Sequence, residues 1–188
     1  MKKISRKFFA RDTHEVAKDL LGKVLARNFY GKKFMGRIVE VEAYVGQDDK
    51  ACHAARGKTK RNAVMFGEAG HAYIYLIYGM YNCLNFVTEQ SGFPAAVLIR
   101  AVEPVARLID VKTDGPGKLT RAMKITRKLN GEDLVTSERL WVAEDDFVLA
   151  KNKIKTAKRI GVAYAGEDAD LLWRYYVKDS KFVSRPHP

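Results

Sequence analysis

The sequence predicts an α+β fold: a single mixed domain over residues 1–188, with a curved, mainly antiparallel β-sheet flanked by helices and a protruding β-hairpin. Three observations support this prediction. β-rich runs fill most of the first half of the chain, whereas helical patterns are concentrated in the second half. No stretch has the composition of an interdomain linker, and no internal repeat is present. A chain of 188 residues is also long enough to bury a substantial core.

The first element is predicted to be a helix that begins near residue 12. The tetrapeptide DTHE at residues 12–15 has the form of a capping box. Val16, Leu20 and Leu21 then follow at helical spacing, and Gly22 is a natural stop.

Two strands and a long loop are predicted next. Residues 23–28 and 33–45 are rich in β-formers, and Tyr30-Gly31 between them is typical of a turn. Polar and basic residues dominate from 46 to 70. Loops of that length are usually functional or disordered.

A hairpin is the clearest element of the central region. The segment HAYIYLIYGMYNCLNFVTE contains two β-rich runs on either side of Gly79-Met80, which predicts a tight bend there. Residues 94–102 form a further apolar run and are predicted to be another strand.

The second half of the chain is predicted to be more helical. The helix expected over residues 118–129 ends at Gly131, and its remaining surface is basic. Its apolar side would consist of Leu119, Ala122, Met123, Thr126 and Leu129. The basic character continues over 151–161, and 171–177 is predicted to return to the sheet.

Charge narrows the class of partner. Lys and Arg number 34 against 22 acidic residues, a formal net charge of +12, and the excess is spread along the chain. Such a field favours nucleic acid or another anionic surface as the partner, although it could also serve only solubility. Cys52 and Cys83 have no spacing typical of a disulfide framework or a zinc site.

We expect a protein of bacterial type that lies in the cytoplasm and is associated with DNA. The basic start of the chain lacks the apolar run of a secretion signal. The most apolar region, residues 72–87, is interrupted by Gly79, Asn82 and Asn85 and is shorter than the roughly 20 residues of a membrane-spanning helix. We therefore expect no membrane association.

The stretch GRIVEVEAY at residues 36–44 places two acids on a strand of a basic protein. Alternation assigns Val39, Val41 and Ala43 to one face of the strand. Glu40, Glu42 and Tyr44 would then share the other face. Most Glu-x-Glu pairs of this kind simply face water.

Three neighbouring features favour chemistry over a solvated surface. Four tyrosines, Tyr73, Tyr75, Tyr78 and Tyr81, lie within nine residues and could stack on nucleobases. Arg100 ends an apolar run and needs a partner, for which Glu40 and Glu42 are candidates. His53, at the start of the basic loop, could donate a hydrogen bond.

Six blocks, in order, resemble the alkyladenine (3-methyladenine) DNA glycosylase family. They are GRIVEVEAYVG, ACHAARGKTKRN, MFGEAGHAYIYLIYGMYNCLN, AAVLIRAVEP, DGPGKL and RIGVAYAGE. The resemblance extends over nearly the whole chain. It implies an enzyme that flips a damaged purine out of duplex DNA and hydrolyses its N-glycosidic bond, which leaves an abasic site.

The resemblance also implies roles for individual residues. Glu42 would activate the attacking water as general base, and Arg100 would help to hold that water. The flipped base would be bound by Tyr44, Tyr75, His53 and Asn85, with the tyrosines stacking on its two sides and Asn85 excluding guanine. Tyr78 would wedge into the gap left by the base, with Met80 and Tyr81 nearby.

Other expectations concern the surroundings of this site. Arg56, Lys58 and Arg61 of the basic loop, together with Lys118 after GPG, suit contacts to the DNA backbone, although a solvated role is equally open for any one of them. No lysine is indicated as a nucleophile, so we expect a monofunctional enzyme without strand cleavage. We expect no metal, no other cofactor and a monomer whose partner is duplex DNA containing damaged purines, with hypoxanthine as a further candidate lesion.

Two other classes of protein remain open from the residues alone. A metal-dependent nuclease could use Glu40, Glu42, Asp48, Asp49 and His53 as ligands for Mg²⁺ or Mn²⁺. A non-catalytic nucleic-acid-binding module could use the tyrosines as a stacking platform, but Glu42 would then weaken binding by repelling phosphate.

Overall fold

The computed structural model of the chain describes residues 1–108 and 111–184 and confirms the α+β class. One sheet contains nine strands, and every pairing between strands is antiparallel. The strands are β1 (Lys2–Lys3), β2 (Val24–Phe29), β3 (Lys32–Val45), β4 (Ala72–Ile77), β5 (Tyr81–Val87), β6 (Ala95–Ala106), β7 (Leu140–Glu144), β8 (Ile154–Ala157) and β9 (Arg174–Val177).

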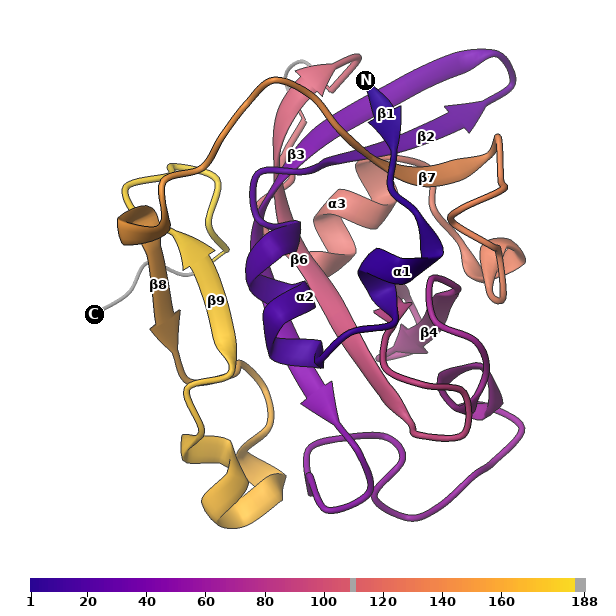
Figure 1. Cartoon of the computed structure of the whole chain (residues 1–188), viewed down its shortest axis with the longest axis vertical. Coiled ribbons are helices and arrows are strands. Elements are labelled where there is room, and N and C mark those ends of the chain that lie inside the picture. The colour runs from indigo at the N-terminus through magenta and orange to yellow at the C-terminus, as the bar shows by residue number, and fades with distance from the viewer. Residues whose placement is uncertain (109–110, 185–188) are drawn as a thin grey trace.

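The helices are short and pack around the sheet (Figure 1). The α-helices are α1 (Arg6–Phe9), α2 (Thr13–Leu20) and α3 (Pro116–Ala122), and the 3-10 helices are η1 (Ala63–Phe66), η2 (Arg127–Leu129), η3 (Lys151–Lys153) and η4 (Ala163–Asp170). The predicted start of α2 is confirmed, because the Asp12 carboxylate accepts the backbone N–H groups of His14 and Glu15, each at 3.0 Å.

Strand β3 is the centre of the sheet, whose order is β1-β7-β2-β3-β6-β5-β4. One edge of β3 pairs with β6. Its other edge pairs first with β2, over residues 32–37, and then with β9, over residues 40–42. The β3–β6 register shifts on both sides of Glu40, where the edge partner changes from β2 to β9. This irregularity bends the strand at the point that carries the acids.

The register shift corrects the simple alternation expected for β3. Ile38, Val41 and Ala43 belong to the main core, whereas Val39 is buried outside it. Glu40 and Glu42 are both fully buried rather than exposed to water. The bulge therefore allows two acids to enter the interior without breaking the apolar face of the strand.

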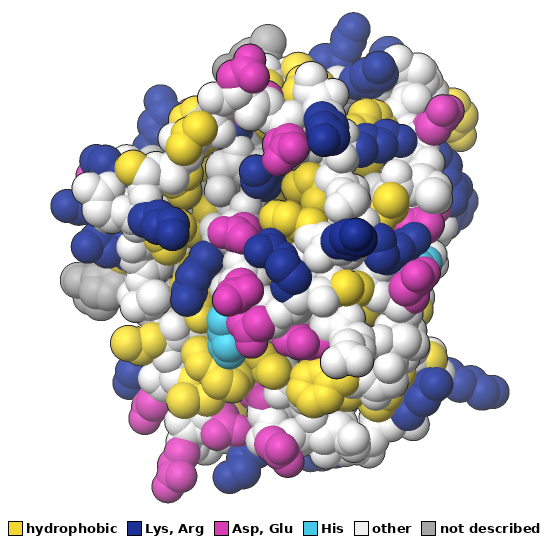
Figure 2. All heavy atoms as spheres, viewed as in Figure 1, with side chains coloured by type: hydrophobic (Ala, Val, Ile, Leu, Met, Phe, Trp, Pro, Cys, Tyr) yellow, Lys and Arg dark blue, Asp and Glu magenta, His cyan; other side chains and the backbone are white. Residues whose placement is uncertain are grey.

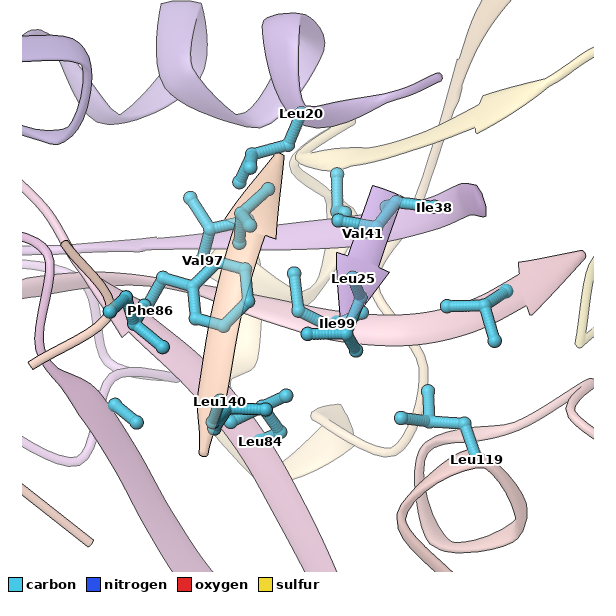
Figure 3. Packing of buried hydrophobic residues seen from close by; sticks show 14 of the residues in the cluster. Leu20, Leu25, Ile38, Val41, Leu84, Phe86, Val97, Ile99, Leu119 and Leu140 are labelled. Carbon is cyan, nitrogen blue, oxygen red and sulfur yellow. The ribbon is translucent and has the colours of Figure 1, made fainter. Parts of the chain in front are cut away.

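The main core lies on one face of the sheet. Leu20 of α2, Val41 of β3 and Ile99 of β6 belong to the same buried cluster (Figure 3). Leu84 and Phe86 extend the cluster along β5. Alternation then directs the intervening residues of these strands, such as Asn85, Leu98 and Arg100, to the opposite face.

The hairpin predicted about Gly79-Met80 is confirmed as β4 and β5. Its turn is closed by a hydrogen bond from Met80 N to Ile77 O at 3.2 Å. Tyr78 and Gly79 both have positive φ, at 52° and 70°, as the central residues of a type I′ turn require. The tip is exposed, because 81% of Tyr78 and 63% of Met80 are accessible to solvent.

The helix predicted over 118–129 is wrong beyond its first part. Helix α3 ends at Ala122, Lys124 has a positive φ of 55°, and only the short turn η2 follows. Ile125 is buried in place of Thr126, which is exposed. The left-handed conformation at Lys124 interrupts the helix, so the apolar side predicted for residues 118–129 does not continue past it.

The second half is also less helical than predicted. Strands β7, β8 and β9 extend the sheet, and the basic segment at 151–161 contains η3 and β8. The strand expected over 171–177 is present as the shorter β9. In the described part of the chain no helix is long and apolar enough to cross a membrane.

Acidic and basic side chains are mixed on the face of the molecule that carries α1 and α2. Figure 2 shows both kinds interspersed there. The excess positive charge of the chain is therefore not gathered into one patch on this face.

Candidate active site

A cavity of about 660 Å³ lies on the face of the sheet opposite the main core. Strands β3 to β6 supply its floor, the start of α3 supplies one wall, and the segment at 160–164 supplies another. Ten of the residues singled out from the sequence line it or come together at its mouth: Tyr44, His53, Arg61, Tyr73, Tyr75, Tyr78, Tyr81, Asn85, Arg100 and Lys118. Glu42, Arg56, Lys58 and Met80 are not part of the lining.

Glu42 lies directly beneath the lining and is held by groups that do belong to it. Its Oε1 accepts the Ile160 N–H at 2.7 Å and lies 3.3 Å from Arg100 Nη1. Its Oε2 accepts the Tyr44 hydroxyl at 2.9 Å. Burial, followed by the nearby Glu42 carboxylate, raises the pKa of Tyr44 well above its ordinary value, so Tyr44 is a neutral donor.

The partner expected for Arg100 is confirmed: it bridges both acids. Its Nε donates to Glu40 Oε1 at 3.1 Å, while its Nη1 faces Glu42. Burial acts to lower the pKa of Arg100, but the two carboxylates outweigh it and raise that pKa. Glu40 has a second arginine partner, because Arg174 Nη1 donates to the same Oε1 at 3.1 Å. Arg37, on the same strand as Glu40, pairs with Asp145.

Three aromatic rings form one end of the cavity. His53 packs edge-on against Tyr75 with their ring centroids 4.4 Å apart. Its Nδ1 lies 2.9 Å from the Tyr73 hydroxyl. The Arg61 guanidinium lies 5.4 Å from the centre of the Tyr75 ring. Arg61 therefore touches the aromatic wall as well as solvent, a contact that the sequence did not reveal.

Asn62 fixes the loop that carries His53. Its Nδ2 donates to the carbonyl groups of His53 and Gly57, both at 2.9 Å, and its Oδ1 accepts the Thr59 N–H. Asn62 is itself buried. The Asn62 amide thus ties together residues 53–62 of the long loop predicted at 46–70.

His53 is neutral at physiological pH, since burial and then the charge of Arg61 lower its pKa from 6.5 to about 4. Between pH 6.5 and pH 4 the His53 imidazole is protonated in the unfolded chain but neutral in the folded protein. The unfolding free energy therefore falls as the pH drops through this range. We expect His53→Gln to show a smaller loss of melting temperature over this pH range than the unmodified protein. Equal losses in the two proteins would contradict the assignment.

Asn85 lies on the floor between the aromatic wall and Arg100. It is buried, and its Nδ2 donates to the Tyr73 carbonyl at 3.0 Å. That hydrogen bond fixes the orientation of the amide, which would otherwise be free to rotate.

The hairpin and α3 meet at the mouth of the cavity. A Cβ at Gly117 would approach the Tyr81 ring to 2.9 Å, so this glycine allows the close contact. Thr120 Oγ1 donates to the Asn82 carbonyl at 2.9 Å. Lys118 Nζ lies 3.0 Å from Asp114. The other two basic residues expected near DNA, Arg56 and Lys58, are exposed on the loop.

A buried ion pair beneath the cavity was missed from the sequence. Arg159 donates to both oxygens of Asp49, at 2.6 and 2.8 Å, and both side chains are fully buried. Its guanidinium lies 4.9 Å from the ring centres of Tyr44 and Trp173. Arg159 also precedes Ile160, the N–H donor to Glu42. The block RIGVAYAGE contains this arginine, but nothing in its spacing reveals the partner 110 positions earlier.

The carboxylates that a nuclease could have used are not gathered together. Glu40 and Glu42 are engaged by Arg100, and Asp49 by Arg159. Within the described ranges no group of three or more His, Cys, Asp or Glu side chains could hold a metal ion.

Comparison with known proteins agrees with this geometry. Residues 7–181 match the family model described as methylpurine-DNA glycosylase. A protein of Methanocella arvoryzae named "Putative 3-methyladenine DNA glycosylase" is 53% identical, with 98% of this chain and 97% of the relative aligned. Proteins with the same name in Legionella pneumophila strain Lens and Alkaliphilus oremlandii are 51% and 48% identical over nearly their whole lengths. The chain therefore belongs to the methylpurine-DNA glycosylase family.

Proposed function

We propose that the protein is a monofunctional DNA-3-methyladenine glycosylase that flips alkylated adenine, and also hypoxanthine, out of duplex DNA. It hydrolyses the N-glycosidic bond with a water activated by Glu42 and leaves an abasic site. The single observation that carries this proposal is the fully buried Glu42 carboxylate beneath an aromatic-lined cavity, held by Tyr44 and Arg100 of the lining. A buried acid is costly unless it is paired, and functional sites are where such groups gather.

The contacts of Glu42 indicate which oxygen takes the proton. Oε1 already has two partners, the Ile160 N–H and Arg100. Oε2 has the Tyr44 hydroxyl, and a carboxylate oxygen can accept a second hydrogen bond. We assign the proton of the attacking water to Oε2. Arg100 would orient the same water through the guanidinium that already links the two acids.

The cavity suits a flat purine. Tyr44 and Tyr75 offer rings on either side, and each base–aromatic stack contributes about 1–3 kcal/mol. His53 and Asn85 would supply polar groups for the edge of the base, and Asn85 would exclude guanine by crowding its exocyclic amine. Because His53 is neutral at physiological pH, it serves as a hydrogen-bonding group rather than as an acid.

Lesion selectivity follows from the leaving group. An alkylated purine carries positive charge and departs without protonation, so a base such as Glu42 is sufficient. Hypoxanthine is neutral and leaves less readily. We therefore expect alkylated adenine to be released faster than hypoxanthine.

We propose that the exposed hairpin tip replaces the flipped base, with Tyr78 as the wedge and Met80 and Tyr81 beside it. Tyr78→Ala should lower the flipping equilibrium by about 5- to 100-fold, the equivalent of one lost stack, and overall affinity by less. The fluorescence of a base analogue next to the lesion would measure flipping. An unchanged flipping equilibrium would refute the wedge assignment.

The backbone at Tyr78 calls for a control. Its φ of 52° is disfavoured for any residue with a Cβ, so tyrosine and alanine carry the same backbone strain and Tyr78→Ala removes only the ring. Tyr78→Gly relieves that strain while it removes the ring, and Tyr78→Phe keeps the ring. Flipping should be weakened in the alanine and glycine variants and retained in the phenylalanine variant.

The exposed loop cations Arg56 and Lys58, together with Arg61 and Lys118 at the cavity, are proposed to contact the DNA backbone. Arg61 would also hold the aromatic wall. Lys118 is the lysine of the described lining, and its Nζ is held in an ion pair with Asp114. This supports base release without strand cleavage.

The test of the proposed function is to incubate the protein with DNA treated with a methylating agent and to identify the bases set free. Released 3-methyladenine is expected, and untreated DNA is the control. Activity should persist in EDTA. Failure to release any purine would refute the proposal.

A further inference from the structure

The C-terminal segment after β9 returns to the two buried acids. Ser184 donates its backbone N–H to Glu40 Oε2 at 2.7 Å. Its hydroxyl accepts a hydrogen bond from Arg100 Nη2 at 3.2 Å. Ser184 lies beyond residues 7–181, which match the family model. The mechanism proposed above assigns this residue no part.

Ser184 supplies the third of three contacts that fix the Arg100 guanidinium. Arg100 Nε faces Glu40, and Nη1 faces Glu42. Nη2 faces Ser184. Each nitrogen of the group therefore has a different partner, which defines both the position of the plane and its rotation.

Glu40 explains why the third contact matters for Glu42. Glu40 is fully buried, and its Oε1 already accepts from Arg100 and Arg174. Its Oε2 receives the Ser184 N–H. Without that donor a buried carboxylate oxygen becomes short of hydrogen bonds. Arg100 could compensate by rotating its guanidinium so that two of its N–H groups donate to the two oxygens of Glu40. Arginine prefers this bidentate geometry, and adopting it would break the contact with Glu42.

We propose that Ser184 is a positioning residue of the active site, which keeps Arg100 shared between Glu40 and Glu42. The C-terminal segment thereby completes the catalytic arrangement without touching the substrate. This inference rests on the proposed glycosylase function, since Arg100 and Glu42 are its reacting machinery.

Three substitutions separate the two contacts of Ser184. Ser184→Ala removes only the hydroxyl, Ser184→Pro removes the N–H donor as well as the hydroxyl, and Ser184→Thr keeps both contacts. Single-turnover base release should be measured with enzyme in excess, which separates the maximal rate constant from the half-saturating concentration. Ser180→Ala is the matched control, because Ser180 lies in the same segment and its hydroxyl, among the described residues, accepts only the Phe182 N–H.

The expected result is a loss of rate without a loss of binding. Ser184→Pro should lower the maximal rate constant by about 10- to 100-fold, the effect of misplacing a catalytic group, and Ser184→Ala by about 3- to 10-fold. The half-saturating concentration should remain close to that of the unmodified protein in each folded variant. The melting temperature should remain close to that of the unmodified protein in Ser184→Ala and Ser184→Thr. Ser184→Thr should restore the rate, and Ser180→Ala should not change it.

The outcomes separate this inference from the proposed function. If the unmodified protein releases no base, the proposed function fails. The positioning role is wrong if the unmodified protein releases base and both Ser184→Ala and Ser184→Pro release it as fast as the unmodified protein does. A threonine variant as slow as the alanine variant would also overturn it, and this comparison decides the matter even if the proline variant does not fold.

Discussion

Glu42→Gln is expected to lower the single-turnover rate of base release by about 100- to 10,000-fold, the usual contribution of a general base, while binding to lesion-containing duplex persists. Glutamine has nearly the shape of glutamate and can still accept the Ile160 N–H that Glu42 Oε1 accepts at 2.7 Å. It cannot take a proton from water. Binding should not weaken, because one negative charge near phosphate is removed. Parallel measurements of the release rate and of the dissociation constant will check both parts.

Glu40→Gln is the matched control for this prediction. Glu40 lies two residues away on β3 and shares Arg100 with Glu42, but its other partners, Arg174 and Ser184, are not part of the cavity lining. We expect a smaller loss of rate from Glu40→Gln than from Glu42→Gln. Normal excision by Glu42→Gln together with inactive Glu40→Gln would show that the catalytic carboxylate is Glu40.

Arg159→Leu is expected to lower the free energy of unfolding by about 3–5 kcal/mol, the cost of leaving one partner of a buried ion pair alone. Asp49 would remain buried, and Arg159 is the group that donates to both of its oxygens. The substitution also removes the cation that lies between Tyr44 and Trp173. Denaturant unfolding monitored by circular dichroism will measure the change.

Two further variants identify the cause of that loss. Asp49→Asn combined with Arg159→Leu removes both charges and should recover part of the stability lost in the single variant. Lys158→Ala breaks the exposed pair with Asp170, where both side chains are more than 60% accessible, and should cost about 1 kcal/mol or less. An Arg159→Leu effect no larger than that of Lys158→Ala would contradict the account of a buried pair.

Much of the first half of the fold could be predicted from sequence because its signals are local. The turns at Tyr30-Gly31 and Gly79-Met80 and the Asp12 cap each depend on neighbouring residues alone. Arg100 was also predictable in part, since a charge after a long apolar run needs a partner. One domain over residues 1–188 stays a prediction, and a single cooperative unfolding transition would test it.

The parts that sequence could not supply depend on distant pairings. The register shift at Glu40 arises where β9 replaces β2 beside β3. The Arg159–Asp49 pair and the return of Ser184 to Glu40 join residues more than 100 positions apart. Strands β7 and β8 were missed because strands of five and four residues give little alternation to detect.

The central claim is that the buried Glu42 drives hydrolysis of a damaged purine from the cavity above it. The most direct test is a duplex with one hypoxanthine or alkylated adenine, end-labelled, incubated with the unmodified protein and with Glu42→Gln. The unmodified protein should leave the strand intact until alkali cleaves it at the lesion, and Glu42→Gln should leave it intact after alkali as well. Alkali-labile sites formed equally by both proteins, or by neither, would contradict the account.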